Sequence, residues 1–365
     1  DGHPGVTADV TRRTLVWLRK ASVSQHRKTC CDLFGSLSLS ARQTPVSTKL
    51  SHAVAEAAHC WIELTETLAA IPPSETYRRW LTIIDWRLSR CADVQPDGVV
   101  PRGAYASCQE LEADLHVIQA SLAGTHNESI ANGEVKRWLD QVRTFGLHTA
   151  RLDVRQDSRY YEAVMAELLA EAEIATDFTA LAERERQELL IKTCGRPVRW
   201  NFEKLSEAAR ETLSLFALLR RTMRCYGPEA LGGHVISMTR APSDVLSVLW
   251  LWQWSRRTDG GHPADDTLRL PIVPLFETIS DLHSSYDTTR ALLDLKTYRD
   301  YVRDQDDQQT IMIGYSDSTK DGGYLAACWA LYLAQVRIHD AACQRGVKLT
   351  FCQGRGGSLG RGGGP

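Results

Sequence analysis

The chain has 365 residues, which is enough for one large domain or two domains of ordinary size. Its 43 Lys and Arg residues are balanced by 45 Asp and Glu residues, which argues against a general attraction to nucleic acid or to an anionic membrane. It contains no apolar run of spanning length and no signal peptide, so we expect no membrane partner.

The ten cysteines are scattered, without a CxxC pair or the His and Cys spacing of a zinc site. We therefore expect free thiols in a reducing cytoplasm rather than a disulfide scaffold. The chain begins with Asp1 instead of Met and stops in a glycine-rich stretch. We therefore interpret it as a fragment of a longer protein.

The first part of the chain has the apolar periodicity of helices. Thr7 or Asp9 can cap a first helix that runs to about Leu33. Further helical patterns cover about 46–71, 75–91, 106–123 and 134–144. We interpret the tryptophans of these helices as packing residues; they are Trp61, Trp80, Trp86 and Trp138. Residues 1–145 are therefore predicted to form a mainly helical segment.

From Leu147 onward, strand patterns alternate with helical patterns. The predicted strands cover about 148–156, 234–239, 269–277, 310–314 and 348–351. The predicted helices cover about 160–173, 183–194, 205–225, 243–254 and 285–303, and a long one begins near Gly323. This alternation indicates an α/β fold with predominant α-helix and a parallel β-sheet, with residues 146–365 as its βα segment.

Four of the five predicted strands end in ionisable residues, which are Arg155, Glu277, Asp317 and Arg355. Because the carboxyl ends of parallel strands meet at one edge, where such folds bind ligands, we expect a functional site there. Glu277 and Asp317 follow neighbouring strands, and paired carboxylates are the oxygen ligands that Mg²⁺ and Mn²⁺ prefer. The alternative is that each carboxylate pairs with a nearby arginine or caps a helix, and the pattern leaves both interpretations open.

Arg151 and Arg155 lie four residues apart and are predicted to share one face of a strand. Such a pair needs an anionic partner, either a buried carboxylate or a substrate phosphate. Arg151 is equally compatible with a structural ion pair, whereas the position of Arg155 at the strand end favours a ligand.

The last predicted strand leads into a loop that holds Arg355, Arg361 and seven glycines. Backbone N–H groups of glycines and guanidinium groups can both donate hydrogen bonds to a small anion. We therefore expect this loop to bind such an anion and to close over it. The alternative is a disordered tail. Neither 314–320 nor 354–363 has the spacing of a nucleotide-binding glycine motif.

Motifs along nearly the whole chain resemble those of phosphoenolpyruvate carboxylase. In order, they are DGHPGVTADVTR, FGLHTARLDVRQDS, HVISMTRAPSDVLSV, IVPLFETISDL, MIGYSDSTKDGG and GRGGSLGRGGGP. The resemblance implies a largely helical protein built around a (β/α)8 TIM-like barrel, of which this chain would supply one part.

The resemblance also implies roles for particular residues. Glu277 and Asp317 match the family's ligands for Mg²⁺ or Mn²⁺, and Arg155 and Arg355 match arginines that bind phosphate and stabilise transferred charge. Lys320 and Arg361 match further catalytic residues, and the second is also linked to inhibitor binding. The residues implied to bind substrate, besides the two phosphate-binding arginines, are Gln353, Gly356 and Gly357.

The implied activity is that of a carboxy-lyase, which carboxylates phosphoenolpyruvate with bicarbonate to give oxaloacetate and phosphate. The reaction would pass through carboxyphosphate and a metal-stabilised enolate, and would feed the tricarboxylic acid cycle. The resemblance further implies a cytoplasmic, allosteric homotetramer that aspartate or malate inhibits.

The chain departs from the family pattern in several places. The family's catalytic histidine, in a TAHPT motif that precedes the region matched here, is absent, and so is the C-terminal part with the remaining effector-site residues. We therefore expect the chain alone to be inactive. Gln353 replaces a histidine of the family's FHGRGG motif. The alternative function is a non-catalytic or altered relative that binds a phosphorylated small anion as a sensor module.

Overall fold

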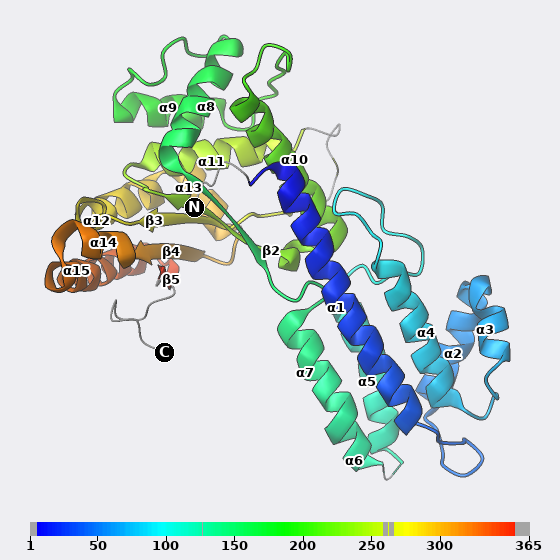
Figure 1. The fold of residues 1–365 in the computed structure, drawn as a ribbon. Helices are drawn as coiled ribbons and strands as arrows, with labels where there is room; N and C mark the ends of the chain where they lie inside the picture. Colours follow the sequence, from blue (N-terminus) through cyan, green and yellow to red (C-terminus); the bar gives the residue numbers. More distant parts are fainter. Residues whose placement is uncertain (1–5, 126, 258–261, 263–265, 355–365) are drawn as a thin grey trace. The chain divides into compact units, whose positions relative to one another are not determined.

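The computed structural model describes residues 6–125, 127–257, 262 and 266–354 (Figure 1). The chain divides into two compact units, a helical unit of Asp9–Arg151 with Arg221–Ala230, and an α/β unit of Asp1–Ala8, Leu152–Arg220 and Leu231–Pro365. All ten cysteines lie in the described part and are free, as predicted. No described helix is both long enough and apolar enough to cross a membrane.

The helical unit contains the helices predicted from apolar periodicity and one short helix that was not predicted, α6. They are α1 (Ala8–Ser36), α2 (Thr48–Cys60), α3 (Thr65–Ala69), α4 (Thr76–Cys91), α5 (Cys108–Ala123), α6 (Glu128–Ile130) and α7 (Lys136–Phe145). The pattern over 46–71 is broken at Trp61 into α2, the 3₁₀ turn η1 (Ile62–Leu64) and α3. The last helix is preceded by a π-helical turn, η2 (Ala131–Val135).

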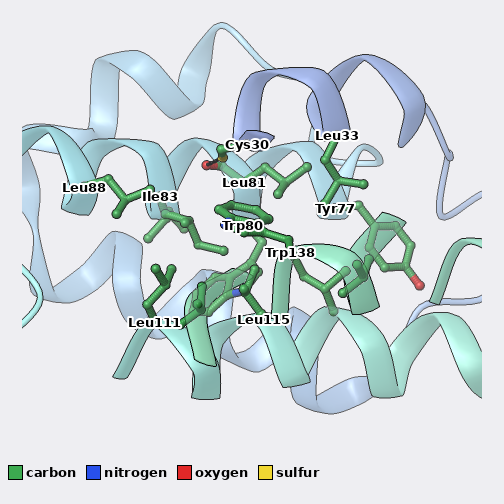
Figure 2. Close-up of a cluster of buried hydrophobic side chains, with 14 of the residues drawn as sticks. Cys30, Leu33, Tyr77, Trp80, Leu81, Ile83, Leu88, Leu111, Leu115 and Trp138 are labelled. Atoms are coloured by element: carbon green, nitrogen blue, oxygen red, sulfur yellow. Dashed lines mark hydrogen bonds between the residues drawn. The ribbon is translucent and has the colours of Figure 1, made fainter. Parts of the chain in front are cut away.

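The predicted packing role of the tryptophans in this unit is confirmed. Trp80 and Trp138 are buried in one hydrophobic cluster (Figure 2). Trp61 and Trp86 are partly buried and pack against this cluster. The two buried indoles also satisfy their N–H groups, since Trp80 Nε1 donates to the Asp114 carbonyl at 3.0 Å and Trp138 Nε1 donates to His26 Nδ1 at 3.1 Å. The cluster therefore excludes water without leaving these donors unpaired.

The α/β unit is built on a five-stranded sheet in the order β1-β2-β3-β4-β5. The strands are β1 (Leu152–Asp157), β2 (Leu231–Ser237), β3 (Ile272–Phe276), β4 (Gln308–Gly314) and β5 (Lys348–Gly354). Every neighbouring pair is parallel, which confirms the predicted parallel α/β fold. The carboxyl ends of the strands therefore lie along one edge of the sheet.

Helices connect these strands, and two of the connections differ from the sequence prediction. The helices are α8 (Ser158–Glu171), α9 (Glu183–Thr193), α10 (Glu207–Tyr226), α11 (Pro242–Ser255), α12 (Ile279–Asp294), α13 (Lys296–Arg303), α14 (Ser316–Gly322) and α15 (Tyr324–Cys343). The predicted helix over 285–303 is two helices, and the first begins soon after β3 because Thr278 Oγ1 accepts from the Asp281 N–H at 3.0 Å. The short α14 was not predicted.

A buried histidine gives the α/β unit a pH dependence. His234 lies on β2, with its Nε2 at 2.6 Å from Tyr161 Oη and its ring stacked on Phe216. Burial lowers the pKa of His234 from 6.5 to about 3, because the charged imidazolium cannot be hydrated there. The neutral form is favoured by folding, so its contribution to stability is complete above pH 6.5 and is lost as the pH falls towards 3.

We expect the variant His234→Gln to lose stability less steeply with falling pH than the unmodified protein. Glutamine still accepts from Tyr161 but does not titrate, and one histidine contributes at most about 1.4 kcal/mol per pH unit. The measurement is the apparent Tm between about pH 7 and pH 4.5. His52→Gln, at an exposed position of α2, is the control and should leave the slope unchanged. Equal slopes for His234→Gln and the unmodified protein would contradict this prediction.

Candidate functional site

Side chains from β1, β2 and β3 meet at the carboxyl edge of the sheet. Arg155 on β1 donates from Nη2 to Glu277 Oε1 at 2.7 Å, directly after the end of β3. The same guanidinium donates from Nε to Ser237 Oγ at 2.6 Å, at the end of β2. Because β2 lies between β1 and β3, the Arg155 side chain extends across one strand to contact Glu277. Ser237, on the strand between them, accepts a hydrogen bond that orients the guanidinium.

Both oxygens of the Glu277 carboxylate have partners. Oε2 accepts from the Met238 N–H at 3.0 Å, while Oε1 accepts from Arg155, and the residue is only 6% exposed. Burial raises the pKa of Glu277, and the negative charge of Asp317 adds to this rise. The positive charge of Arg155 and the hydrogen bond from the Met238 N–H lower the pKa and oppose it. The charges of Glu277 and Asp317 are therefore close enough to influence each other.

Asp317 lies on α14, the short helix that follows β4. Lys320 Nζ donates to Asp317 Oδ1 at 2.9 Å, one helical turn further along, and the lysine side chain is 66% exposed. The unpredicted helix is thus the element that places an ammonium group beside the second carboxylate.

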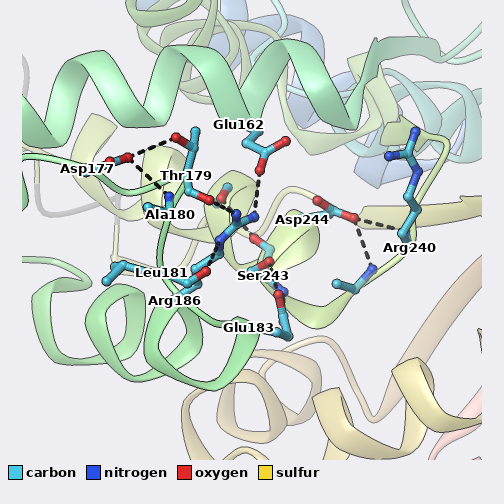
Figure 3. Close-up of polar contacts among 12 residues, drawn as sticks. Glu162, Asp177, Thr179, Ala180, Leu181, Glu183, Arg186, Arg240, Ser243 and Asp244 are labelled. Carbon is cyan, nitrogen blue, oxygen red and sulfur yellow. Dashed lines mark hydrogen bonds and ion pairs between the residues drawn. The ribbon is translucent and has the colours of Figure 1, made fainter.

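The turn after β2 is fixed by contacts from both of its sides. Thr239 N donates to the Leu275 carbonyl at 3.0 Å, which ties the turn to β3. Asp244 accepts from the N–H groups of Arg240 and Ala241 at the start of α11 (Figure 3). The beginning of α11 is in turn held by Glu183 of α9, which accepts from Ser243 N and Oγ at 3.0 and 2.6 Å (Figure 3). These contacts fix the backbone that presents the Met238 N–H to Glu277.

The structure brings together four of the residues singled out in the sequence, which are Arg155, Glu277, Asp317 and Lys320. Gln353 is exposed on β5, in register with Ile313 of β4. The remaining loop residues lie outside the described part of the chain; they are Arg355, Gly356, Gly357 and Arg361.

The prediction that Arg151 shares a strand face with Arg155 was wrong. The strand begins only at Leu152, so Arg151 precedes it, and its side chain is exposed. Sequence reasoning also missed Ser237 and Met238. Their position at the end of β2 could have identified them, because the other four predicted strands each end in a candidate site residue.

The donor set of Glu277 and Asp317 fits a hard divalent cation. Mg²⁺ commonly takes one or two protein carboxylates and completes its shell with water and substrate phosphate. Within the described residues, no group of three or more His, Cys, Asp and Glu side chains is arranged to hold a metal. The alternative pairing with basic side chains is also present, as Glu277 with Arg155 and Asp317 with Lys320.

Comparisons with known proteins agree over the whole chain. The family model described as "Phosphoenolpyruvate carboxylase" matches residues 1–365. A phosphoenolpyruvate carboxylase from Roseiflexus castenholzii is 37% identical over 100% of the chain and 40% of the relative. Those from Mycobacterium avium and Mycobacterium leprae are each 38% identical over 100% of the chain and 39% of the relative. The chain thus spans about two fifths of the length of these relatives.

Proposed function

This chain belongs to the phosphoenolpyruvate carboxylase family. We therefore propose that the full-length protein catalyses the carboxylation of phosphoenolpyruvate with bicarbonate, which gives oxaloacetate and phosphate. The observation that carries this proposal is the family match over the whole chain, together with the cluster of Arg155, Glu277, Asp317 and Lys320. Since the chain spans about two fifths of its relatives, the activity is proposed for the full-length protein.

The proposed reaction has two steps. A bicarbonate oxygen attacks the phosphorus of phosphoenolpyruvate, and the bond from phosphorus to the enol oxygen breaks, giving carboxyphosphate and the enolate of pyruvate. Carboxyphosphate then releases carbon dioxide and inorganic phosphate. The enolate carbon forms a new carbon–carbon bond with carbon dioxide, which yields oxaloacetate.

The site residues are suited to the charges of this reaction. Ser237 and Glu277 orient the Arg155 guanidinium at the strand edge, where a fixed positive charge stabilises a phosphate dianion. Lys320 adds a second, more exposed positive charge beside Asp317. A Mg²⁺ or Mn²⁺ ion bound by Glu277 and Asp317 would supply further positive charge for the developing enolate oxygen.

Further parts of the proposal follow from the family alone. We propose that the loop with Arg355, Gly356, Gly357 and Arg361 binds the phosphate and keeps water away from the enolate. The parallel strands are proposed to form part of a (β/α)8 TIM-like barrel, and their order β1-β2-β3-β4-β5 is compatible with one. The full-length protein is proposed to be a cytoplasmic, allosteric homotetramer that feeds the tricarboxylic acid cycle.

One observation favours a second candidate, a sensor module that binds a phosphorylated small anion without turnover. Gln353 stands where the family pattern has a histidine. Assaying the full-length protein with phosphoenolpyruvate, bicarbonate and Mg²⁺ separates the two functions. Oxaloacetate formation supports the carboxylase, whereas binding of phosphoenolpyruvate without any oxaloacetate supports the sensor.

We expect Gln353→His to change the rate of the full-length enzyme by roughly tenfold. Glutamine keeps a hydrogen-bond donor but never carries charge, and a charge-assisted bond exceeds a neutral one by about 1–2 kcal/mol. The measurement is kcat/KM from about pH 6 to pH 9, where the introduced imidazole should add a dependence on its own protonation. If only the histidine variant makes oxaloacetate, the carboxylase proposal fails for the natural sequence.

A further inference from the structure

Gly314, the last residue of β4, lies against Glu277. A Cβ atom added to Gly314 would lie 3.0 Å from Glu277 Cα, 3.1 Å from its Cγ and 3.3 Å from its Cβ. Carbon atoms in good contact are about 3.5–4.0 Å apart, so a side chain here would displace Glu277. Gly314 is not among the described glycines with positive φ. The close approach, rather than the backbone conformation, therefore explains why this position needs a glycine.

Gly314 also contacts the segment that carries the second carboxylate. Ser318 Oγ donates to the Gly314 carbonyl at 3.0 Å, and Ser318 is fully buried next to Asp317 in sequence. Gly314 thus contacts both Glu277 and the start of α14, the two segments that carry the carboxylates.

Met238 holds Glu277 from the side of β2. Its φ of 55° is rare for a residue with a side chain, and its N–H donates to Glu277 Oε2 at 3.0 Å. Leu275 N also donates to Thr239 Oγ1 at 3.3 Å, so the turn after β2 is bonded to β3 just before Glu277. Glu277 is therefore confined between a directed N–H on one side and a glycine on the other.

We propose that Gly314 is a positioning residue, which sets the separation of the Glu277 and Asp317 carboxylates by allowing β4 to contact Glu277 directly. This inference rests on the proposed metal-dependent function. Mg²⁺ and Mn²⁺ tolerate little variation in ligand distance, so a small displacement of one carboxylate weakens binding. Gly314 itself contacts Glu277 and the start of α14, and acts on a cation only through them.

The test compares Gly314→Ala with Gly233→Ala in the full-length protein. A Cβ at Gly233 would lie 2.9 Å from Val273 Cγ2, a similar collision between neighbouring strands of the same sheet but towards their amino ends. The measurement is the Kd for Mn²⁺ alone, without substrate. We expect Gly314→Ala to raise this Kd at least about tenfold, the size of effect typical of changes to the residues that orient metal ligands. Gly233→Ala does not contact Glu277, so it should leave the Kd within about twofold.

Other outcomes would overturn the inference. An unchanged Kd in Gly314→Ala, equal weakening in both variants, or no Mn²⁺ binding by the unmodified protein would each contradict a positioning role. Normal Mn²⁺ binding without oxaloacetate formation would contradict only the proposed carboxylase activity.

A stability measurement covers the case in which Gly314→Ala does not fold. Truncating Glu277 to alanine removes the Cγ atom that the new methyl group would meet at 3.1 Å, whereas the contacts with Cα at 3.0 Å and Cβ at 3.3 Å remain. We therefore expect the double variant Gly314→Ala/Glu277→Ala to fold, and part of the apparent Tm cost of Gly314→Ala to be relieved in the Glu277→Ala background. A cost that is the same in both backgrounds, or a double variant that fails to fold, would show that the glycine only accommodates the backbone at Glu277 and does not position its carboxylate, which would contradict the inference.

Discussion

Asp317→Asn in the full-length protein should lower Mg²⁺-dependent oxaloacetate formation by about a hundredfold or more. The neutral amide is a poorer ligand for a hard dication than a carboxylate. The substitution also removes the negative charge that Asp317 places near Glu277 and the partner of Lys320. The measurement is the initial rate as a function of Mg²⁺ concentration, with saturating phosphoenolpyruvate and bicarbonate.

The control for this substitution is Asp340→Asn, the same exchange at an exposed position of α15. This variant should retain the rate and the Mg²⁺ dependence of the unmodified protein. If Asp317→Asn instead showed the same rate and the same Mg²⁺ dependence as the control, Asp317 would serve only as the partner of Lys320. The shared metal site would then be wrong.

The strands and most helices could be predicted because their signals are local. Short apolar runs such as 310–314 and 348–351 fall within β4 and β5, and long periodic segments match helices such as α4 and α15. The short α14 gave no such signal, since its sequence SDSTKDG is polar and ends in a glycine. Hydrogen bonds of Thr319 N and Oγ1 to the Tyr315 carbonyl, at 3.2 and 2.7 Å, stabilise it instead.

The candidate site could be predicted only in part, because its contacts depend on strand order and register. Arg155 and Glu277 are 122 residues apart, and their strands are separated by β2. The sequence shows that four of the five predicted strands end in ionisable residues, but not that the Arg155 side chain passes Ser237 to pair with Glu277. The same limit explains the wrong placement of Arg151, since the first residue of a strand is set by pairing with its neighbour, here Leu152 with Leu231.

Arg155→Lys should lower kcat/KM for phosphoenolpyruvate by about a hundredfold, although the positive charge is kept. The guanidinium uses Nε for Ser237 Oγ and Nη2 for Glu277 Oε1, so two separate nitrogens fix its orientation. A lysine has one nitrogen on a flexible chain and cannot make both contacts with the geometry of a planar fork. The side chain is 28% exposed, so its replacement should affect the site more than the packing of the unit.

Arg159→Lys provides the matched control, because this arginine on α8 is 62% exposed and pairs with Asp157 at 3.5 Å. Exposed ion pairs contribute about 1 kcal/mol or less, so the control should keep kcat/KM within about twofold. The apparent Tm of both variants distinguishes an effect on the site from an effect on folding. If Arg155→Lys lost stability without losing kcat/KM, the arginine would hold Glu277 in place but would not contact the phosphate. A loss of kcat/KM at unchanged Tm is the result that the proposed phosphate contact requires.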